Sequence, residues 1–268
     1  MTHTTATHKP TLMQKLLGRR YKWWYIMQYE FKLAYTQWLN ILLIVIRFLL
    51  PLGITYIIIN YTGSNKLNNE YLIIGSLIYQ FFAFTIGPSY DLTNNVIKGD
   101  FTKFLIRPTN YFQHLIFRIL GYNSFTLFIR LSIFFAAILH LGYNLKNLAI
   151  LIPYILIIWI LGFCLEIING SFVFFQHELN KTYLPFYYDL LPFLSGSLIS
   201  LSLLNSKVIE STPFAYLVYH PMQIYLGKYD FNQTLMVFAG GIAWCVVLYF
   251  LAKWIFKMGL KRNEAVGL

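Results

Sequence analysis

The sequence is poor in charged residues and in cysteine. Only 12% of its 268 residues are charged, about half the share found in a soluble domain. Because 57% are hydrophobic, too little polar surface remains to cover a globule, and the same composition excludes intrinsic disorder and collagen-like repeats. Cys164 and Cys245 lie inside apolar runs, which excludes a disulfide scaffold and predicts two inert packing residues. With a mean hydropathy of +0.56, the chain is predicted to be an all-α integral membrane protein.

Motifs of catalysis are also lacking. The chain has no G-x-x-x-x-G-K-[ST] phosphate-binding loop, no G-x-S-x-G and no Cys-x-x-Cys. His177-Glu178 begins like the zinc motif H-E-x-x-H, but Lys181 stands where the second histidine would be. We therefore expect neither enzymatic activity nor a metal or cofactor on this chain.

Six apolar segments are long enough to cross a bilayer, which requires roughly 20 residues each. They are Leu39–Ile59, Leu72–Tyr90, Leu115–Leu141, Leu148–Phe175, Leu184–Leu204 and Leu235–Phe256. With these boundaries, thirteen of the 21 Lys and Arg residues lie on one side of the membrane and four on the other. The positive-inside rule then predicts a multi-pass protein with both termini in the cytoplasm. The net charge of +11 thus reflects topology and contact with anionic lipids, and we expect no nucleic-acid partner.

The segments around the spans divide the chain further. Residues 1–11 are rich in Thr and His and predict a flexible tail, and residues 257–268 form a cytoplasmic tail after the transmembrane domain 36–256. In residues 12–35, basic and apolar side chains fall on opposite helical faces, and a Trp-Trp-Tyr cluster suits the head-group region. This pattern favours an interfacial helix on the inner leaflet over an ordinary polar lead-in.

Two connections carry further patterns. In the cytoplasmic loop 91–114, an apolar stripe with helical spacing starts at Ile97 and ends before Pro108. Such an amphipathic helix either lies on the membrane or inserts into a groove of a partner, and the pattern leaves both open. In the external connection, Phe214–Leu226 is apolar but too short to span. We expect one or two short re-entrant or interfacial segments there, before the last span, with a compact external loop as the alternative.

Three short motifs occur within this frame. From Ile97 to Pro108, a basic residue, a glycine and an acid are followed by apolar residues and Arg-Pro; Tyr219-His220-Pro221 precedes the last span, and Gly259-Leu260-Lys261-Arg262 follows it. Together with the six spans and the long loop after the second, these motifs resemble the ABC-2 type transporter permease family, in the branch that includes viologen exporter-like permeases. Asn263 and Ala265 depart from that branch, in which Tyr and Ser are usual.

The resemblance implies a function and partners. The chain would be the permease subunit of an ABC exporter in the bacterial cytoplasmic (inner) membrane, moving an amphipathic, lipid-linked or drug-like substrate out of the cell. A separate ATPase subunit would bind ATP and Mg²⁺, and a second permease chain would complete a homodimer or heterodimer. The family couples to its ATPase through a helix whose matching residues here are Ile97, Lys98, Gly99, Asp100, Phe101, Lys103, Phe104, Leu105 and Arg107.

Charged residues inside the predicted spans are further candidates, because a charge in the bilayer core is costly unless it is paired or hydrated. Arg118, Glu166 and Asp189 are expected in the cytoplasmic third of the membrane, where Arg118 and Glu166 form a plausible pair. Arg47 and Arg130 are expected nearer the middle. These residues either line a polar path for the substrate or have a structural role, by pairing or by snorkelling to the membrane surface.

Two other functions stay open at this point. An ion-gradient-driven secondary transporter would also carry charges within its spans, although no paired interrupted spans indicate inverted repeats. A non-transporting membrane scaffold would need neither charged spans nor a patterned cytoplasmic loop. Dependence on an ATPase partner distinguishes the exporter from both.

Overall fold

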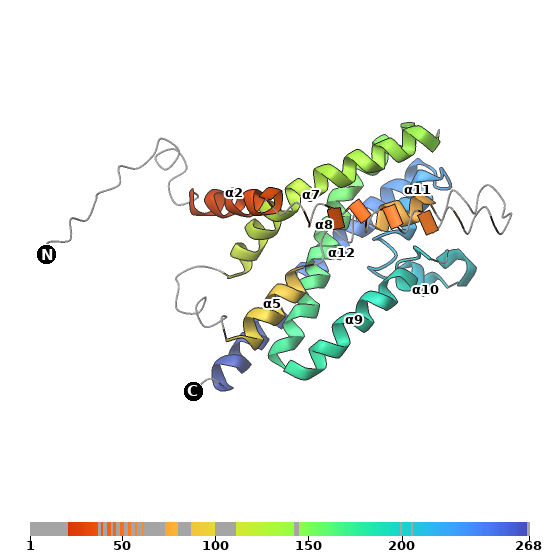
Figure 1. The fold of residues 1–268 in the computed structure, drawn as a ribbon. Coiled ribbons are helices and arrows are strands. Elements are labelled where there is room, and N and C mark those ends of the chain that lie inside the picture. The colour runs from red at the N-terminus through yellow and green to blue at the C-terminus, as the bar shows by residue number, and fades with distance from the viewer. Residues whose placement is uncertain are drawn as a thin grey trace, which may run out of the picture.

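The computed structural model describes residues 21–36, 73–79, 87–99, 111–141, 145–198, 200–204 and 206–266, with separate positions between residues 39 and 61. Within these ranges the regular secondary structure is helical, without strands. The elements in chain order (Figure 1) are α2 (Tyr21–Thr36), α5 (Pro88–Ile97), α7 (Tyr111–Leu141), α8 (Leu145–Ser171), η2 (Phe172–Phe174), α9 (His177–Leu194), η3 (Leu201–Leu204), α10 (Lys207–Glu210), α11 (Tyr219–Tyr225) and α12 (Phe231–Val266).

Three of these helices are long and apolar enough to cross a membrane. The segments with this property are Tyr111–Ala136 in α7, Ala149–Phe174 in α8 with η2, and Phe231–Arg262 in α12. They coincide with the predicted third, fourth and sixth spans. The predicted first span, Leu39–Ile59, lies mostly outside the described residues.

Helix α8 lies at the centre of the described bundle and packs against α5, α11 and α12 (Figure 1). Helix α12 approaches it closely at Gly241, where an added Cβ would lie 2.9 Å from the side chain of Ile157. Further along α12, the ring of Phe256 packs against those of Tyr111 and Phe174, with centroids 5.8 Å away in both cases. Because aromatic rings bury large apolar areas, this cluster holds α7, η2 and α12 together at one end of the bundle.

The predicted second span, Leu72–Tyr90, is wrong as a single helix. Residues 73–79 are helical, but Pro88 begins the separate helix α5, and Gly87 before it has a φ of 148°. Glycine adopts such a φ readily, whereas other residues do so rarely. Proline is favoured in the first helical turn because the N–H that it lacks would have no partner there. Tyr90 therefore lies on α5.

The predicted fifth span, Leu184–Leu204, is also wrong as a single helix, because α9 ends at Leu194. Gly196 has a φ of 78° and donates its N–H to Phe193 O, while the N–H of Ser197 is donated to Pro192 O. This pair of hydrogen bonds is the Schellman motif, which ends a helix by satisfying its last carbonyl groups. The chain then turns towards η3.

Helix α2 runs along the first half of α7 in the same direction. Contacts recur every fourth residue on both helices and join Trp23 to Phe117, Met27 to Gly121 and Phe31 to Phe125. The Trp23 and Phe117 rings stack with centroids 5.4 Å apart, and at Gly121 an added Cβ would lie 2.8 Å from the Met27 Cα. The interfacial position expected for residues 12–35 stays a prediction, and the structure adds that α7 is the packing partner of α2.

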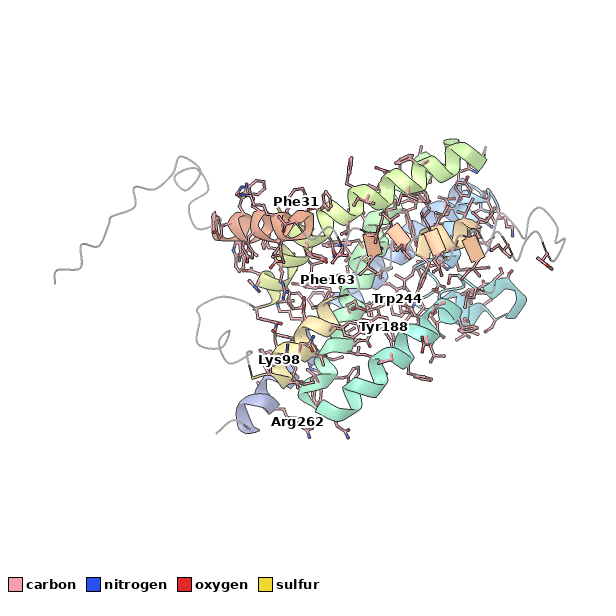
Figure 2. All side chains as sticks on the ribbon, viewed as in Figure 1. Phe31, Lys98, Phe163, Tyr188, Trp244 and Arg262 are labelled. Atoms are coloured by element: carbon pink, nitrogen blue, oxygen red, sulfur yellow. The ribbon has the colours of Figure 1, made fainter. Side chains whose placement is uncertain are left out.

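The apolar stretch Phe214–Leu226 forms turns followed by the short helix α11, all of whose residues are buried. His220 anchors this helix, with Nε2 2.8 Å from Glu210 O and Nδ1 3.0 Å from the Tyr229 hydroxyl oxygen. On α12, the indole N–H of Trp244 (Figure 2) donates to Ser211 O at 2.9 Å. The stretch is thus packed against protein, and its re-entrant position in a membrane stays a prediction.

Candidate functional site

The first turn of α5 is joined to two other helices by a buried carboxyl group. Glu166 on α8 has 0% of its surface exposed. It accepts hydrogen bonds from Ser89 Oγ on α5 at 2.6 Å and from the Tyr188 hydroxyl on α9 at 2.9 Å. The backbone N–H of Gly87, which directly precedes α5, donates to the same carboxyl at 3.4 Å. One side chain therefore links α5, α8 and α9.

The two hydroxyl groups also contact each other, which makes the cluster a closed network. Ser89 Oγ and the Tyr188 hydroxyl oxygen are 2.6 Å apart, and the Tyr90 ring on α5 stacks on that of Tyr188 with centroids 5.6 Å apart. Within the described part of the chain, the groups that donate hydrogen bonds to Glu166 are the two hydroxyls and the backbone N–H groups of Gly87 and Ser89. Such hydrogen bonds offset the cost of removing a carboxyl group from water.

A glycine makes this close contact between α5 and α8 possible. At Gly170, one turn after Glu166 on α8, an added Cβ would lie 2.7 Å from the Cα of Ser89. Real Cβ atoms do not approach other atoms so closely. A glycine at this position therefore lets the backbone of α5 approach near enough for Ser89 to reach the Glu166 carboxyl.

A second cluster joins α5 to α2 and α7. Arg118 on α7 lies between two carboxylates, with Nε 3.3 Å from Glu30 Oε1 on α2 and Nη1 3.2 Å from Asp91 Oδ2 on α5. All three side chains are partly exposed: 33% for Arg118, 13% for Glu30 and 35% for Asp91. The guanidinium group has donors in a fixed fork and can bind two acids at once. Arg118 thus bridges three elements that are distant in the sequence.

Partial burial raises the pKa of both acids, Glu30 and Asp91. Desolvation raises the pKa of Asp91, and the positive charge of Arg118 counteracts this shift in part. The pKa of Glu30 is also raised, again chiefly by desolvation and against the attraction of Arg118. Glu30, Asp91 and Arg118 line a cavity of about 310 Å³, together with Gly87 and Asn123. The ion pairs are therefore in contact with a space large enough for water.

The structure brings some predicted site residues together and separates others. The expected pairing of Arg118 with Glu166 is wrong, since Arg118 pairs with Glu30 and Asp91, and Glu166 is bound by hydroxyl groups. Asp189 is exposed on α9, and Arg130 is half-buried on α7. Arg47 lies outside the described residues.

Comparison with known proteins identifies the family. A family model described as "ABC-2 family transporter protein" matches residues 39–267, which is most of the chain. The chain belongs to this family. It is therefore a membrane protein with the permease role of ABC-2 transporters. No curated protein and no solved structure matches the chain.

In this ABC-2 protein, α5 ends where the predicted coupling segment begins. Ile97 is the last residue of α5, Lys98 is its C-cap, and Gly99 has a φ of 73° and donates its N–H to Val96 O. The expected helical stripe from Ile97 to Leu105 is wrong at its start, because a glycine in this conformation ends a helix. The remaining predicted coupling residues, Asp100, Phe101, Lys103, Phe104, Leu105 and Arg107, lie outside the described residues.

Sequence reasoning missed the neutral members of both clusters and one acid. Ser89 and Tyr188 carry no charge and lie outside any motif, so nothing in the sequence marks them. Glu30 lies in a segment expected at the membrane surface, where an acid needs no partner, and the sequence therefore does not single it out. The Gly87-Pro88 pair was a usable signal, since glycine before proline favours a break and a new helix start.

Proposed function

We propose that this ABC-2 protein is the transmembrane subunit of an ABC exporter that has its ATPase on a separate subunit. ATP and Mg²⁺ bind to that partner, and the permease chain moves an amphipathic, lipid-linked or drug-like substrate out of the cell. Two permease chains, identical or different, form the transport unit in the bacterial inner membrane. In this arrangement the chain itself has no catalytic residue.

The attachment of α5 at its first turn, together with the position of the coupling-like segment directly after it, supports this proposal best. Its first turn is bound to α8 and α9 through Glu166, and to α2 and α7 through Arg118. Its last residue, Ile97, leads directly into the segment that resembles the coupling helix. A displacement of that segment by the ATPase would therefore be transmitted through a ten-residue helix to four helices of the bundle. We propose that Lys98, Phe101 and Phe104 contact the ATPase and are displaced by it.

The distribution of basic residues supports the proposed orientation, with six spans and both termini in the cytoplasm. Lys98 at the end of α5 and Arg262 near the end of α12 lie at the same end of the bundle (Figure 2). Lys257 and Lys261 are exposed on the same part of α12. Cytoplasmic ends of membrane helices are enriched in such residues.

The charged residues within the predicted spans are assigned roles from the contacts described above. Arg118 and Glu166 hold helices together, and we assign them a structural and coupling role. Asp189, which is exposed on α9, and Arg130 and Arg47 are left as the candidates for a polar substrate path. We expect Arg47→Ala to lower export while assembly stays intact; normal transport by a well-expressed variant would remove Arg47 from the path.

The test is isolation of the tagged chain from its native host in a gentle detergent. Co-eluting subunits are identified, and ATP hydrolysis is assayed with and without vanadate. We expect an ATPase that co-elutes with the parent chain and is lost from the double variant Phe101→Asp/Phe104→Asp. The control is Phe231→Asp, which places a charge on an exposed phenylalanine at the first position of α12, before the predicted span Leu235–Phe256, and should retain the ATPase.

The same experiment separates the alternatives. Transport that follows an ion gradient and has no ATPase in the eluate would indicate a secondary transporter. Indifference of all activities to the Phe101 and Phe104 substitutions, with no ATPase present, would indicate a scaffold. Either result contradicts the exporter proposal.

A further inference from the structure

The contacts among Glu166, Ser89 and Tyr188 need one hydrogen atom more than the two hydroxyl groups supply. Ser89 Oγ lies 2.6 Å from Glu166 Oε2 and 2.6 Å from the Tyr188 hydroxyl oxygen, which is itself 2.9 Å from Glu166 Oε1. Oxygen atoms approach one another this closely when a hydrogen lies between them. If Glu166 accepts from both hydroxyls, no hydrogen is left for the contact between the hydroxyls. A protonated carboxyl group supplies the third hydrogen.

The surroundings of the two carboxyl oxygens indicate where that hydrogen lies. Oε2 faces the backbone N–H of Gly87 at 3.4 Å and Ser89 Oγ at 2.6 Å, and it is therefore an acceptor. With the proton on Oε1, Glu166 donates to Tyr188, Tyr188 donates to Ser89, and Ser89 donates to Oε2. The Tyr188 contact, which a carboxylate would accept, is then donated by the acid. Each group in this ring donates once, and hydrogen bonds in such a chain strengthen one another.

No cation compensates a negative charge on Glu166 in the described part of the chain. Glu166 lies within the apolar segment Ala149–Phe174, ~12 Å from its end at 1.5 Å per residue. An unpaired charge at such a depth in a membrane is costly. The groups that interact with Glu166 are hydrogen-bond donors, and the guanidinium group of Arg118 is bound by Glu30 and Asp91 instead. The surroundings therefore favour the neutral acid, as the hydrogen count does.

The titratable side chains that face Glu166 from the neighbouring described elements do not change this balance. They are Tyr79 in the helical residues 73–79, Tyr90 on α5, and Tyr187, Tyr188 and Asp189 on α9. Tyrosines ordinarily ionise only near pH ~10, so they are neutral at physiological pH. Asp189 is exposed, and a negative charge there disfavours a second one on Glu166.

We propose that Glu166 is a proton-binding site that controls the docking of α5. While α5 is docked, Glu166 carries a proton on Oε1 and closes the ring with Ser89 and Tyr188. When α5 tilts away, Gly87 and Ser89 leave the carboxyl group, and water from the cavity of about 310 Å³ that Gly87 lines reaches it. The O–H bond of the acid then breaks, its electron pair stays on Oε1, and the proton passes to the water. Docking of α5 thus binds one proton, and its displacement releases one.

The proton is a ligand of the docked state, so acidification favours docking. Its binding requires neither an ATPase nor transport, and it goes beyond the exporter function proposed above. It can therefore be measured on the purified full-length chain, and the result does not depend on whether the chain couples to an ATPase.

The first test is infrared spectroscopy of the purified chain in lipid nanodiscs at neutral pH. A protonated carboxylic acid has a carbonyl stretching band above the amide region, which shifts in heavy water, whereas a carboxylate lacks this band. We expect the band in the difference spectrum of the parent chain and Glu166→Gln. The matched control is Asp189→Asn, which replaces an exposed acid on α9 by its amide and should give no such band. Absence of the band for Glu166 would show a carboxylate and would overturn the proposal.

The stability of two Glu166 variants provides an independent measurement. An amide can donate one hydrogen bond to Tyr188 and accept another from Ser89, as the neutral acid does. Glu166→Gln should therefore keep the unfolding midpoint of the parent protein at neutral pH, whereas Glu166→Ala should lower it. A Glu166→Gln protein as unstable as Glu166→Ala would contradict the neutral ring.

The second test follows α5 itself with spin labels at Asn94→Cys on α5 and Phe186→Cys on α9. Both positions are exposed, and the native thiols of Cys164 and Cys245 are buried. We expect the distance between the labels to change as the pH rises from neutral towards, but not into, the range in which tyrosines ionise. Glu166→Gln should abolish this change. No change in the parent protein, or an equal change in Glu166→Gln, would separate docking from the proton and overturn the proposal.

Discussion

Ser89 and Glu166 meet across the contact of α5 with α8, with Ser89 Oγ 2.6 Å from Glu166 Oε2. They are separated by 77 residues in the sequence, and both are fully buried. A serine hydroxyl is the smallest side chain that can donate to the carboxyl group while the two backbones remain this close. The stability of the contact and its role in coupling can be tested through these residues.

Ser89→Ala is expected to destabilise the protein by ~1–3 kcal/mol, because it removes one donor from a buried carboxyl group. The thermal unfolding midpoint in detergent should fall by several degrees, and ATPase-coupled transport should decrease. Ser132→Ala is the control: its hydroxyl is exposed and bonds only within α7, to Phe128 O. Equal midpoints for the two variants would show that Ser89 adds nothing to the contact.

Gly170→Ala should separate α5 from α8. Its added Cβ would lie 2.7 Å from the Ser89 Cα, and relief of such a contact costs ~1–3 kcal/mol in a packed interior. We expect a lower unfolding midpoint together with loss of stimulated ATP hydrolysis. Gly75→Ala provides the comparison, because its Cβ would lie 3.5 Å from Ser197 O, an ordinary contact. A Gly170→Ala protein as stable and as active as Gly75→Ala would contradict the close approach.

Asp91 should make the protein less stable as the pH rises. Its pKa is raised in the folded state, chiefly by desolvation, so the folded chain holds the proton more strongly than the unfolded chain. Stability is therefore greatest below the ordinary pKa of 3.8 and falls as the pH rises through the raised value. Asp91→Asn should flatten the dependence of the unfolding midpoint on pH in this window.

The pKa of Glu30 is also raised in the folded protein, so a variant of Glu30 serves as a second probe of the same cluster. Glu30→Gln should also flatten the profile, and the double variant should flatten it further. Profiles of the parent and double-variant proteins that run parallel across the acidic range would exclude a contribution from this cluster.

His220, in contrast to the two acids, should make the protein less stable as the pH falls. Burial lowers its pKa, and its Nε2 faces the carbonyl oxygen of Glu210 at 2.8 Å, which requires a proton on that nitrogen. Nδ1 then accepts a hydrogen bond from Tyr229, and this arrangement fits the neutral ring. Because the folded state disfavours the charged ring, its contribution is present above the ordinary pKa of 6.5 and is lost on acidification.

The measurement is the thermal unfolding midpoint of the protein at a series of pH values above and below 6.5. The parent protein should lose stability on the acidic side, and His220→Gln should be less stable overall with a weaker dependence on pH in this range. His114→Gln, on the half-buried face of α7, is the control and should retain the parent's profile. The same slope for His220→Gln and the parent would assign the titration to another group.

The long helices α7, α8 and α12 were predictable, because length and hydropathy alone define a helix that can cross a membrane. The ends of α5 and α9 do not follow from these two properties. Hydropathy continues across Gly87 and across Gly196, but α5 begins directly after Gly87, which has a positive φ, and α9 ends with the capping hydrogen bonds around Gly196. A scan for apolar content averages over such single positions, whereas capping depends on them.

The partner of Arg118 was mispredicted for a different reason. Counting residues along the spans gives the depth of a side chain, and depth alone suggested Glu166. It does not give the direction in which a side chain points around its helix or the position of the neighbouring elements. Those directions place Arg118 against α2 and α5 and turn Glu166 towards Ser89 and Tyr188, and they follow only from the packed structure.

The four-residue register between α2 and α7 restricts how the transporter can move. Sliding α2 by one turn, ~5.4 Å, would bring the Trp23 indole onto Gly121, where the two backbones already touch. The two helices therefore travel as a single rigid body. Movement of other helices relative to this pair then requires hinges. The glycines with positive φ on either side of α5, Gly87 and Gly99, are suitable positions for such hinges. A push on the chain beyond Gly99 would tilt α5 about its attachment to α8 near Gly87, while the angle at Gly99 changes.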